Sequence, residues 1–487
     1  MISRVAVVGG GISGLAAAHR LRALLGPSAA IIVLEQRDQL GGVLRTVDLA
    51  GVAFDVGAEA FLARRPEVPE LLAELGLAGE QVFPTGAAPS VRAGGATGPL
   101  PGGTLLGVPT SAARLDGLLS ATGLAAVAAE PDLPLRWDTG ADVALGGLLR
   151  ERFGDELVDR LADPLLGGVY AGRVDALGLR PTIPALAAAL DAGARSLTTA
   201  ADTTPASPPN SRGGSPDPAR RVPRSSTASA SVEHGGPVFG AVRGGYVVLL
   251  DALVAAAAPQ VRLRTTVRAV VRRRDGWQLT LGPTTAPEVL DVDAVLFAVP
   301  APAVARLLAP AAPHAARAAG EIELASSVVV ALAYRATDAA TLPATSGALV
   351  AAGEPLSIKA VTHSTTKWAH LAPDGLVRLR ASLGRFGEAA TVQSDDAELV
   401  ARVRADLATL TGITAAPVAV HVQRWGGGLP QYAVGHLDRV RAIEERLPPG
   451  LAVAGAALHG VGVPACVATA RAAAQLLAAQ HAASAAP

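Results

Sequence analysis

Several residue types that carry specialised roles are scarce in this sequence. Among its 487 residues there is one cysteine, Cys466, so no internal disulfide can form and a reducing compartment is expected. Positive and negative side chains balance to a net charge of zero, which gives no chain-wide electrostatic reason to bind nucleic acid or an acidic surface. The sequence has neither H-x-x-x-H nor C-x-x-C spacing and no evident Ser-His-Asp order. Neither a metal site nor a hydrolytic triad is therefore predicted.

Long uninterrupted apolar runs are also absent, although half of the residues are apolar. Asp251 breaks the run Tyr246–Ala258, and no segment is long enough for a transmembrane helix. A strand-like segment begins at Arg4 with no basic leader before it, which argues against a cleaved signal peptide. We therefore expect a cytoplasmic protein. Peripheral contact of the helical region 112–195 with the inner face of the cell membrane stays open, because periodicity cannot separate such contact from helix packing.

The N-terminal segment carries the clearest motif in the chain. Arg4–Val8 predicts a buried strand, Gly9–Gly14 follows with G-x-G-x-x-G spacing, and Leu15–Leu25 predicts a helix. Glycines at this spacing permit a tight turn, let the backbone approach a pyrophosphate, and let the helix pack closely on the strand. The helix then points its N-terminal amides at the phosphates. The sequence therefore predicts a dinucleotide site.

The next segment narrows the choice of dinucleotide. The predicted strand Ala30–Leu34 delivers Glu35 about 20 residues beyond the glycines, where a carboxylate can hold the hydroxyls of an adenosine ribose. A glycine pair, Gly41-Gly42, and Arg45 follow. This arrangement resembles the E-x-x-x-x-x-G-G-x-x-x-[ST] motif of the FAD-binding amine oxidase superfamily, in which the glycine turn and the arginine lie against the FAD pyrophosphate. The resemblance implies FAD, and a surface turn with a solvated arginine is the alternative.

Composition and periodicity divide the rest of the chain. The length fits two or three domains. Segment 198–236 is dominated by Ser, Pro, Thr, Gly and Arg, so it is predicted to be a disordered insertion. We predict an α/β fold built from a discontinuous Rossmann-like FAD-binding domain, a helical substrate subdomain with membrane contact left open, and an antiparallel-sheet substrate-binding domain. The FAD-binding domain is expected at 1–88, 237–300 and 415–480. The helical subdomain is expected at 89–197, and the substrate-binding domain at 301–414.

Six further segments carry a resemblance to one family. Together they resemble the bacterial oxygen-dependent protoporphyrinogen and coproporphyrinogen oxidases of haem biosynthesis, over nearly the whole chain outside 198–236. One departure is Ala457–His459, where members often carry an aromatic residue before the glycine. The segments are Phe54–Leu62, Leu100–Ser111, Asp163–Arg173, Lys359–Leu371, Arg424–His436 and Gly455–Cys466.

The last of these segments predicts a second phosphate contact at the far end of the chain. An apolar strand, a glycine turn and a small-residue helix start repeat the geometry of the first motif, so both turns are expected to clasp one FAD. The resemblance implies that this FAD is bound non-covalently. The implied contacts are Gly9, Gly10, Gly11, Ile12, Ser13, Gly14, Glu35, Gln36, Gly42, Val43, Arg45, Gly57, Ala58, Glu59, Ala60, Val267, Trp425, Val461, Gly462 and Val463.

The resemblance also implies a reaction. Six electrons leave a porphyrinogen in three two-electron steps, each a hydride transfer from a bridging carbon to flavin N5 with loss of a pyrrole proton. Oxygen reoxidises the flavin and yields hydrogen peroxide. No catalytic side chain is identified, because the flavin carries the chemistry. Four histidines could move protons near neutral pH but are better explained by packing or surface roles, namely His363, His370, His436 and His459.

Substrate recognition rests on fewer signals. Arginine suits the propionates of a tetrapyrrole, so Arg92, Arg173 and Lys367, with Gly168 for close approach, are candidate contacts. The alternative is that each cation is solvated. Abundant Ala, Arg and Pro with only two lysines indicate a GC-rich genome, and family members from GC-rich Gram-positive lineages usually act on coproporphyrinogen III. We therefore favour that substrate over protoporphyrinogen IX, although the motifs do not decide between them.

Two other functions stay open. An amine oxidase of the same superfamily would use Cys466 to bind flavin covalently and Trp425 with Tyr432 to flank an amine. Aromatic residues make up only 3% of the chain, a poor supply for a cation-binding cage, and a lone cysteine is ordinarily buried. A non-catalytic flavin-binding protein would use 198–236 to contact haem-pathway enzymes. Transient contact with such enzymes is the one protein partnership expected.

Overall fold

The predicted nucleotide motif forms the centre of a parallel sheet. In the computed structural model, which describes residues 4–204 and 237–485, β1 (Arg4–Val8) pairs in parallel with β2 (Ala30–Leu34) and β16 (Ala294–Phe297). Val5 to Val8 are all buried, as expected of a parallel strand that is covered on both faces. The sheet has the order β12-β2-β1-β16-β22, with β12 (Gln260–Arg262) and β22 (Leu451–Val453) at its edges.

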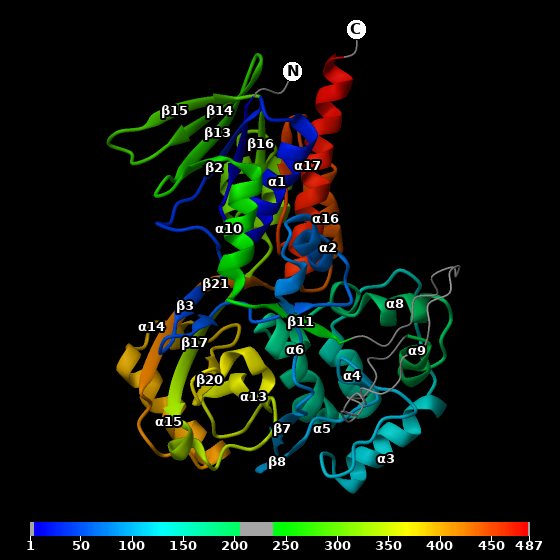
Figure 1. The fold of residues 1–487 in the computed structure, drawn as a ribbon. Coiled ribbons are helices and arrows are strands. Elements are labelled where there is room, and N and C mark those ends of the chain that lie inside the picture. Colours follow the sequence, from blue (N-terminus) through cyan, green and yellow to red (C-terminus); the bar gives the residue numbers. More distant parts are fainter. Residues whose placement is uncertain (1–3, 205–236, 486–487) are drawn as a thin grey trace, which may run out of the picture.

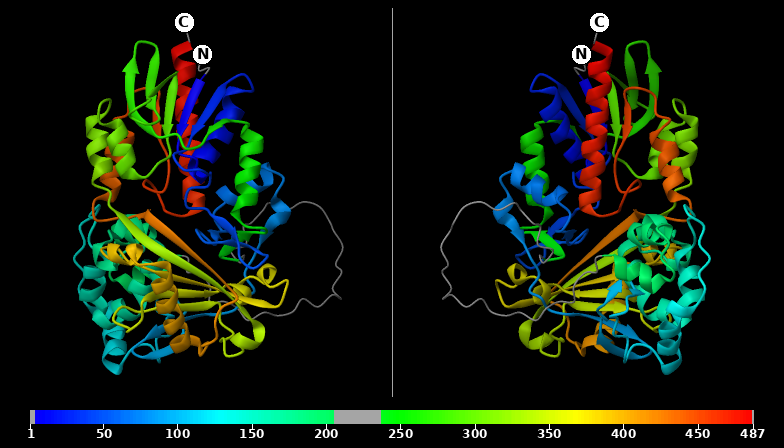
Figure 2. Two further views of the ribbon diagram at one scale, coloured as in Figure 1. Left: turned by 90° about the vertical axis from the view of Figure 1, so that its left-hand side faces the viewer. Right: turned by 90° about the vertical axis from the view of Figure 1, so that its right-hand side faces the viewer.

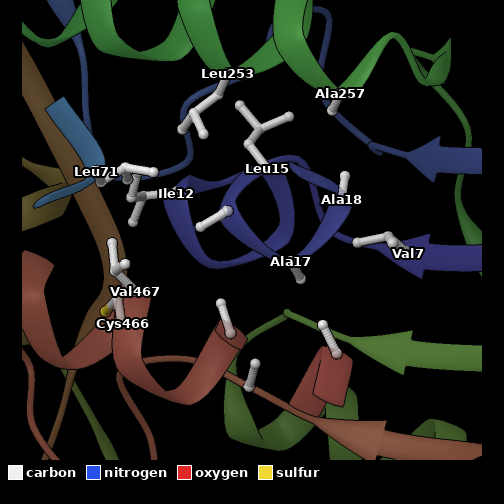
Figure 3. Close-up of a cluster of buried hydrophobic side chains, with 14 of the residues drawn as sticks. Val7, Ile12, Leu15, Ala17, Ala18, Leu71, Leu253, Ala257, Cys466 and Val467 are labelled. Atoms are coloured by element: carbon white, nitrogen blue, oxygen red, sulfur yellow. The ribbon is translucent and has the colours of Figure 1, made fainter. Parts of the chain in front are cut away.

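Three helices cover one face of this sheet. Figure 3 shows α1 (Ile12–Leu25) lying between α10 (Tyr246–Ala257) and α17 (Val463–Ala485), which comes from the other end of the chain. Alanines at buried positions of α1 and α17, such as Ala17 and Ala470, let the two backbones approach closely. The first and last helices are thereby packed into one core. Helix α2 (Glu67–Glu74) adds side chains at its edge.

The other face carries a smaller antiparallel sheet and more helices. Val270, Leu279, Val304 and Val440 from these elements pack with the parallel strands in a second core. The elements are β13 (Val267–Arg273), β14 (Gly276–Leu281), β15 (Glu288–Val292), α11 (Ala301–Leu308), α12 (Pro313–Gly320) and α16 (His436–Glu444).

A seven-stranded sheet forms the second layer of the molecule. In both views of Figure 2 it lies below the nucleotide-binding part, and the long strands β17 and β21 reach towards that part. Helix α15 (Asp396–Thr411) covers its outer face, where Leu399, Val403 and Leu407 join the core. In sheet order the strands are β21 (Ala419–Pro430), β17 (Leu324–Arg335), β20 (Leu376–Leu383), β19 (Ile358–His363), β18 (Gly347–Val350), β7 (Pro89–Ala93) and β8 (Ala96–Pro99).

The helical region lies beside this sheet (Figure 1). Its apolar periodicity is satisfied within its own core, which contains Leu149, Phe153, Leu161 and Leu186. No helix within the described ranges is long and apolar enough to cross a bilayer. The region comprises α3 (Ala121–Ala129), α4 (Leu145–Phe153), α5 (Asp155–Leu157), α6 (Asp163–Tyr170), α7 (Leu179–Thr182), α8 (Pro184–Asp191) and α9 (Leu197–Thr203).

Short strands and helices connect these layers. Their bounds are β3 (Thr46–Asp48), β4 (Ala53–Asp55), β5 (Phe61–Leu62), β6 (Gln81–Val82), β9 (Thr104–Leu105), β10 (Val108–Pro109), β11 (Phe239–Val242), α13 (Ser364–Lys367) and α14 (Ala389–Gln393). Strand β11 pairs with both β5 and β6, so it lies beside the segment that follows Phe54. Strand β7 pairs with β8 and β9 pairs with β10, so segment 89–109 forms two hairpins.

The expected domain bounds differ from the sheets in three places. Helices α11 and α12 fall within the expected substrate domain at 301–414, yet they pack on the parallel sheet. Strand β21 falls within the expected FAD-binding segment 415–480, yet it pairs with β17. Strands β7 and β8 fall within the expected helical subdomain but extend the seven-stranded sheet. The chain crosses between layers inside these segments, where composition does not change.

The predicted disordered insertion, 198–236, overlaps an ordered helix at its start. Residues 198–203 lie in α9, whose N-cap Ser196 accepts a hydrogen bond from the amide of Thr199. The Glu130 carboxylate accepts hydrogen bonds from the amides of Leu197 at 2.8 Å and Thr198 at 3.0 Å. The helix start is therefore satisfied by a side chain far away in the sequence. The remaining part of the prediction, 205–236, lies outside the described residues.

Candidate functional site

A cleft opens where the parallel strands end and the first glycine turn begins. It is bounded by segments from both ends of the chain and from β21. Its walls include Gly9, Gly11, Ile12, Ser13, Glu35, Gln36, Gly42, Val43, Val267 and Trp425 from the predicted contacts, together with Ala298–Ala301, Gly426–Gly428, Gly455–Ala457 and Cys466. Ten of the predicted cofactor contacts therefore line one cleft at the carboxyl ends of parallel strands, where such folds bind nucleotides.

The glycines of the first turn have different roles. A Cβ atom on Gly14 would lie 1.9 Å from the Gly9 carbonyl oxygen, and one on Gly9 would lie 2.3 Å from the Ala298 carbonyl oxygen. These two positions require glycine for packing of the chain itself. A Cβ on Gly11 would meet nothing closer than the Gly42 Cα, at 3.6 Å. The space beside Gly11 is therefore open to a ligand, and the turn fits a pyrophosphate.

The start of α1 is suited to binding an anion. Its N-cap is Gly11, which offers no side-chain hydrogen bond, and no acidic residue lies in its first turn. Ile12 and Ser13 of that turn line the cleft. Free amides at a helix start carry a partial positive charge, which stabilises phosphate groups by about 0.3–1 kcal/mol or more when the site is partly buried.

Glu35 sits at the end of β2, as the spacing predicts. One carboxylate oxygen accepts a hydrogen bond from the Gly10 amide and the other accepts one from the Arg37 amide, each at 2.8 Å. The buried carboxylate thus fixes the glycine turn while lining the cleft. This position suits ribose hydroxyls, which can donate to its remaining lone pairs.

The C-terminal glycine turn lies against the N-terminal one. Gly455 has φ +127°, and a Cβ placed on it would lie 3.7 Å from the Ser13 Oγ. Cys466, near the start of α17, lines the same cleft and is buried (Figure 3). Burial raises the pKa of its thiol to about 11 despite the nearby Ser13 hydroxyl. At neutral pH the sulfur is therefore a thiol and not the thiolate that would act as a nucleophile.

The segment Gly57–Ala60, which the resemblance implies among the FAD contacts and which we call the flavin-side segment, lies beside Val43. A Cβ on Gly57 would lie 1.8 Å from the Val43 carbonyl oxygen, so this position also requires glycine. The Trp425 indole donates to the Val56 carbonyl at 3.0 Å, which ties the segment to the cleft wall. The other ten predicted contacts do not line the cleft, namely Gly10, Gly14, Arg45, residues 57–60 and residues 461–463.

A group of ionised side chains surrounds this flavin-side segment. The Lys367 ammonium donates to the Glu59 carboxylate at 2.7 Å, and the Arg380 guanidinium donates to the Gly57 carbonyl. Burial alone would raise the pKa of Glu59, but Lys367 and Arg380 together lower it. Burial raises the pKa of the neighbouring Asp55 to about 6, although the Thr46 hydroxyl donates to it at 2.6 Å.

The inner face of the seven-stranded sheet is only partly covered. Val329, Ala331 and Ala333 of β17 pack there against Phe54 and Trp368. By contrast, the face remains partly exposed at five residues, which we call the open face: Ser327, Leu349, Thr362, Arg380 and Ser382. On the other side of the sheet, alternate residues are buried under α15.

The end of α6 borders this open face. Gly168 is exposed, and its Cβ position lies 3.6 Å from the Leu349 side chain. The flavin-side segment lies at another border, because Arg380 on the open face reaches Gly57. Ser327 pairs with Trp425 of the cleft wall, so the open face also adjoins the nucleotide cleft.

The three cations predicted to contact substrate already have carboxylate partners. Arg92 pairs with Glu354 at 3.1 Å and Lys367 with Glu59 at 2.7 Å. Arg173, with its side chain 56% exposed, lies 3.9 Å from Glu388. Sequence reasoning assigned no role to Lys359, Arg380 or Arg385, although Lys359 falls in the predicted segment Lys359–Leu371. The side of the sheet on which each of them lies depends on strand register, which the sequence does not show.

Histidine geometry agrees with packing roles. His436 stacks on Tyr432 with ring centroids 3.9 Å apart, and burial lowers its pKa to about 4. His363 is buried against the Thr345 carbonyl, and exposed His459 pairs with Glu444. His370 packs at the edge of Trp368. Across residues 4–204 and 237–485, no three His, Cys, Asp or Glu side chains gather as a metal site.

These features define a class of protein. A parallel nucleotide-binding sheet whose cleft joins both chain ends, set beside an open antiparallel sheet, is the architecture of a two-domain flavin-dependent oxidoreductase. The model of the flavin containing amine oxidoreductase family matches residues 12–478, and the chain belongs to this family.

Curated relatives match nearly end to end. The coproporphyrinogen III oxidase of Mycobacterium tuberculosis (strain H37Rv) is 45% identical over 464 residues, which covers 95% of this chain and 94% of the relative. The Bacillus subtilis (strain 168) protein of the same name is 30% identical and covers 95% of each chain. The predicted membership among FAD-dependent porphyrinogen oxidases of the amine oxidase-like superfamily is thereby confirmed, and the protein is an FAD-dependent oxidoreductase.

Solved structures support the same fold. A protein named as a candidate protoporphyrinogen oxidase from Exiguobacterium sp. 255-15 superposes with a TM-score of 0.81 at 29% identity, covering 98% of this chain and 99% of its own. Cyclohexylamine oxidase from Brevibacterium oxydans IH-35A gives 0.71 at 16% identity, covering 99% and 100%, which shows a shared fold alone. The predicted α/β fold is confirmed.

Proposed function

We propose that the protein oxidises coproporphyrinogen III to coproporphyrin III in haem biosynthesis. Curated relatives of that name align along 95% of the chain, which supports the substrate. The structural observation that carries the proposal is the position of Gly57–Ala60. On one side Gly57 packs against Val43, which lines the nucleotide cleft. On the other side the Gly57 carbonyl accepts a hydrogen bond from Arg380 on the open face.

The cofactor proposed is non-covalently bound FAD held by the twenty residues that the sequence predicts. Gly11 and the start of α1 would receive the pyrophosphate, and Glu35 the ribose. Val267 would lie by the adenine, while Gly57–Ala60, Trp425 and Val461–Val463 would surround the ring. The glycine geometry, the uncapped helix and the protonated Cys466 thiol support this arrangement.

The three parts proposed are those that the sequence predicts, with α11, α12, β21, β7 and β8 assigned to the layers with which they pack. The nucleotide cleft would lie mainly in the discontinuous FAD-binding part, and the open face between the sheet and helical parts. A bound FAD supplies the hydride acceptor and passes the electrons to oxygen. Overall, one porphyrinogen and three O₂ give one porphyrin and three H₂O₂, so six hydrogens and six electrons balance.

The protein's own contribution is orientation and exclusion of water. The open face is apolar at Leu349 and the end of α6, which suits the faces of a macrocycle. Of the six hydrogens lost, four leave bridging carbons and two leave pyrrole nitrogens; three leave as hydrides and three as protons. Hydroxyls of Ser327, Thr362 and Ser382 on the open face can relay the protons towards solvent, and the proposal assigns no protein group as acid or base.

The amine oxidase alternative fits the geometry less well. The Trp425 indole is committed to the Val56 carbonyl, and the Tyr432 hydroxyl donates to the Ala456 carbonyl at 2.6 Å. Both rings are buried, and Tyr432 is stacked on His436, so they do not form an aromatic cage for an amine. Protoporphyrinogen IX, with two propionates in place of four, remains the second candidate substrate with the same mechanism.

We place the enzyme in the cytoplasm, with transient contact to other haem-pathway enzymes as its proposed protein partnership and no nucleic-acid partner. The apolar periodicity of the helical region is accounted for by its own core, so the proposal does not need peripheral membrane contact.

The experiment is a turnover assay on the purified holoenzyme with oxygen. Porphyrin fluorescence and peroxide are measured with coproporphyrinogen III, protoporphyrinogen IX and an aliphatic amine. The proposal predicts fastest turnover with coproporphyrinogen III and three peroxide molecules for each porphyrin. Peroxide formed with the amine and not with either porphyrinogen would overturn it.

A further inference from the structure

Lys359 occupies an irregular position in strand β19. The pairing of β19 with β20 shifts register between Ile358 and Ala360, so the strand bulges at Lys359. Ile358 and Val361 both belong to the core under α15, although regular alternation would place them on opposite faces. The bulge therefore turns both Lys359 and Ala360 towards the open face. Bulges often re-aim a side chain in this way beside binding sites.

The Lys359 ammonium is a buried charge without a counter-ion. The residue is only 7% exposed, and its Nζ donates one hydrogen bond, to the Gly384 carbonyl at 2.9 Å. None of the carboxylates in the described part of the chain lies within ion-pair distance of it. An ammonium has three donors, so two are left without a described partner. Burying such a charge without a partner costs free energy, which a bound anion would recover.

The charged neighbours of Lys359 are mostly cationic. Burial, together with Arg385 and Arg380, lowers its pKa to about 8, and Glu388 alone opposes them. Arg385 donates from Nη2 to the Val350 carbonyl at 3.2 Å. The Glu388 carboxylate is occupied by the Arg385 backbone amide at 3.0 Å. The result is a local excess of positive charge at the end of β20.

This group lies at a defined distance from the flavin-side segment. Arg380 reaches Gly57, and Gly384, which accepts the Lys359 hydrogen bond, follows four residues later, just past the end of β20. At about 3.4 Å per residue, the backbone positions of Arg380 and Gly384 are roughly 14 Å apart. That distance is on the scale of a tetrapyrrole with its side chains. A macrocycle with a bridging carbon at the flavin end would present a propionate at the Lys359 end.

We infer that Lys359 and Arg385 form a carboxylate-binding subsite that takes a propionate of the porphyrinogen. The inference rests on the proposed function, since it names how that substrate is held. The subsite differs from the predicted substrate cations, because Arg92, Arg173 and Lys367 each have a carboxylate near them within the protein. Lys359 and Arg385 have none within ion-pair distance among the residues described.

The test measures porphyrin binding directly and not turnover. Holoenzyme is titrated with coproporphyrin III and, separately, with its tetramethyl ester, and binding is followed by porphyrin fluorescence. Lys359→Met should weaken binding of the acid about ten-fold or more, as expected for a lost charged hydrogen bond, and leave the ester unchanged. Lys359→Arg should keep binding within about three-fold, because it keeps the charge. Arg335→Met, at an exposed position far along β17, is the matched control.

A stability measurement separates binding from a structural role. Removing an uncompensated buried charge should leave the melting temperature of the porphyrin-free holoenzyme unchanged or raise it. Should Lys359→Met fail to fold, Arg385→Met carries the same prediction. A lower melting temperature, or equal losses for acid and ester, would overturn the subsite. If the wild type binds neither porphyrin, the proposed function is overturned as well. If both variants bind the acid as tightly as the wild type does, the subsite alone is overturned.

Discussion

The ammonium of Lys367 lies 2.7 Å from the carboxylate of Glu59, and this ion pair joins the antiparallel-sheet layer to the flavin-side segment. The side chains are 20% and 13% exposed, so both charges are largely removed from water. Arg380 adds a second cation from the same layer by donating to Gly57. Residues 57–60 are thus held from the cleft side by Trp425 and from the sheet side by two cations.

The first prediction concerns this ion pair. Lys367→Met should lower the free energy of unfolding by about 1–3 kcal/mol, because Glu59 would be left largely buried with only Arg380 to balance it. Urea unfolding of the holoenzyme measures the change. Adding Glu59→Gln to the same chain should restore most of the loss, since the unpaired charge is then removed. Arg441→Met is the control: its pair with Asp438 is 63% and 77% exposed, so its loss should be small.

The second prediction concerns the first glycine turn. Gly11→Ala should fold normally, because the added methyl group meets nothing closer than 3.6 Å, yet it should bind FAD at least about ten-fold more weakly. The methyl group would fill the gap where the pyrophosphate is proposed to lie. Flavin absorbance per protein and far-ultraviolet circular dichroism measure the two properties. Gly98→Ala, in open space on β8, should keep both, and full flavin content in Gly11→Ala would refute the placement.

The third prediction concerns pH. The pKa of Asp55 is about 6 in the folded protein against about 3.9 when unfolded, so between these values the folded state binds more protons. Asp55 therefore lowers the free energy of unfolding progressively as pH rises from about 4 to 6, and the full loss remains above pH 6. Asp55→Asn should stabilise the protein by up to about 2–3 kcal/mol at pH 8 and by little at pH 4. Thermal unfolding at both pH values tests this, and an equal effect at each would contradict it.

The fourth prediction concerns flavin attachment. Cys466 lines the cleft with a thiol whose pKa is about 11, so it should not form a bond to the flavin. Acid precipitation should leave the yellow colour in the supernatant. Cys466→Ala should retain FAD, losing only the packing of a small buried side chain. A yellow pellet from the wild type and a colourless one from the variant would support covalent attachment instead.

Local sequence signals predicted the nucleotide-binding part well. The strand Arg4–Val8, the strand Ala30–Leu34 and the position of Glu35 are as expected, because glycine turns, apolar runs and spacing act over a few residues. The approach of Gly455 to Ser13 was also anticipated, since a repeated strand-turn-helix pattern implies a shared site. These elements could be predicted because the residues that determine them lie within the same short segments.

Features that depend on distant partners could not be predicted. The start of α9 needs Glu130, and β21 continues through Gly426–Gly428 because β17 supplies its partner strand. The orientation of Lys359 depends on a bulge that follows from pairing with β20. The ion pairs of Arg92 and Arg173 likewise join segments far apart in sequence. Contacts of this kind are decided by tertiary packing.

The central claim is that a flavin and a porphyrinogen meet at residues 57–60. The most direct measurement is anaerobic mixing of the holoenzyme with coproporphyrinogen III while the visible flavin band is followed. We predict that the band bleaches within the time of one turnover and returns when oxygen is admitted, together with porphyrin fluorescence. A flavin that stays oxidised in the presence of excess porphyrinogen would contradict the account.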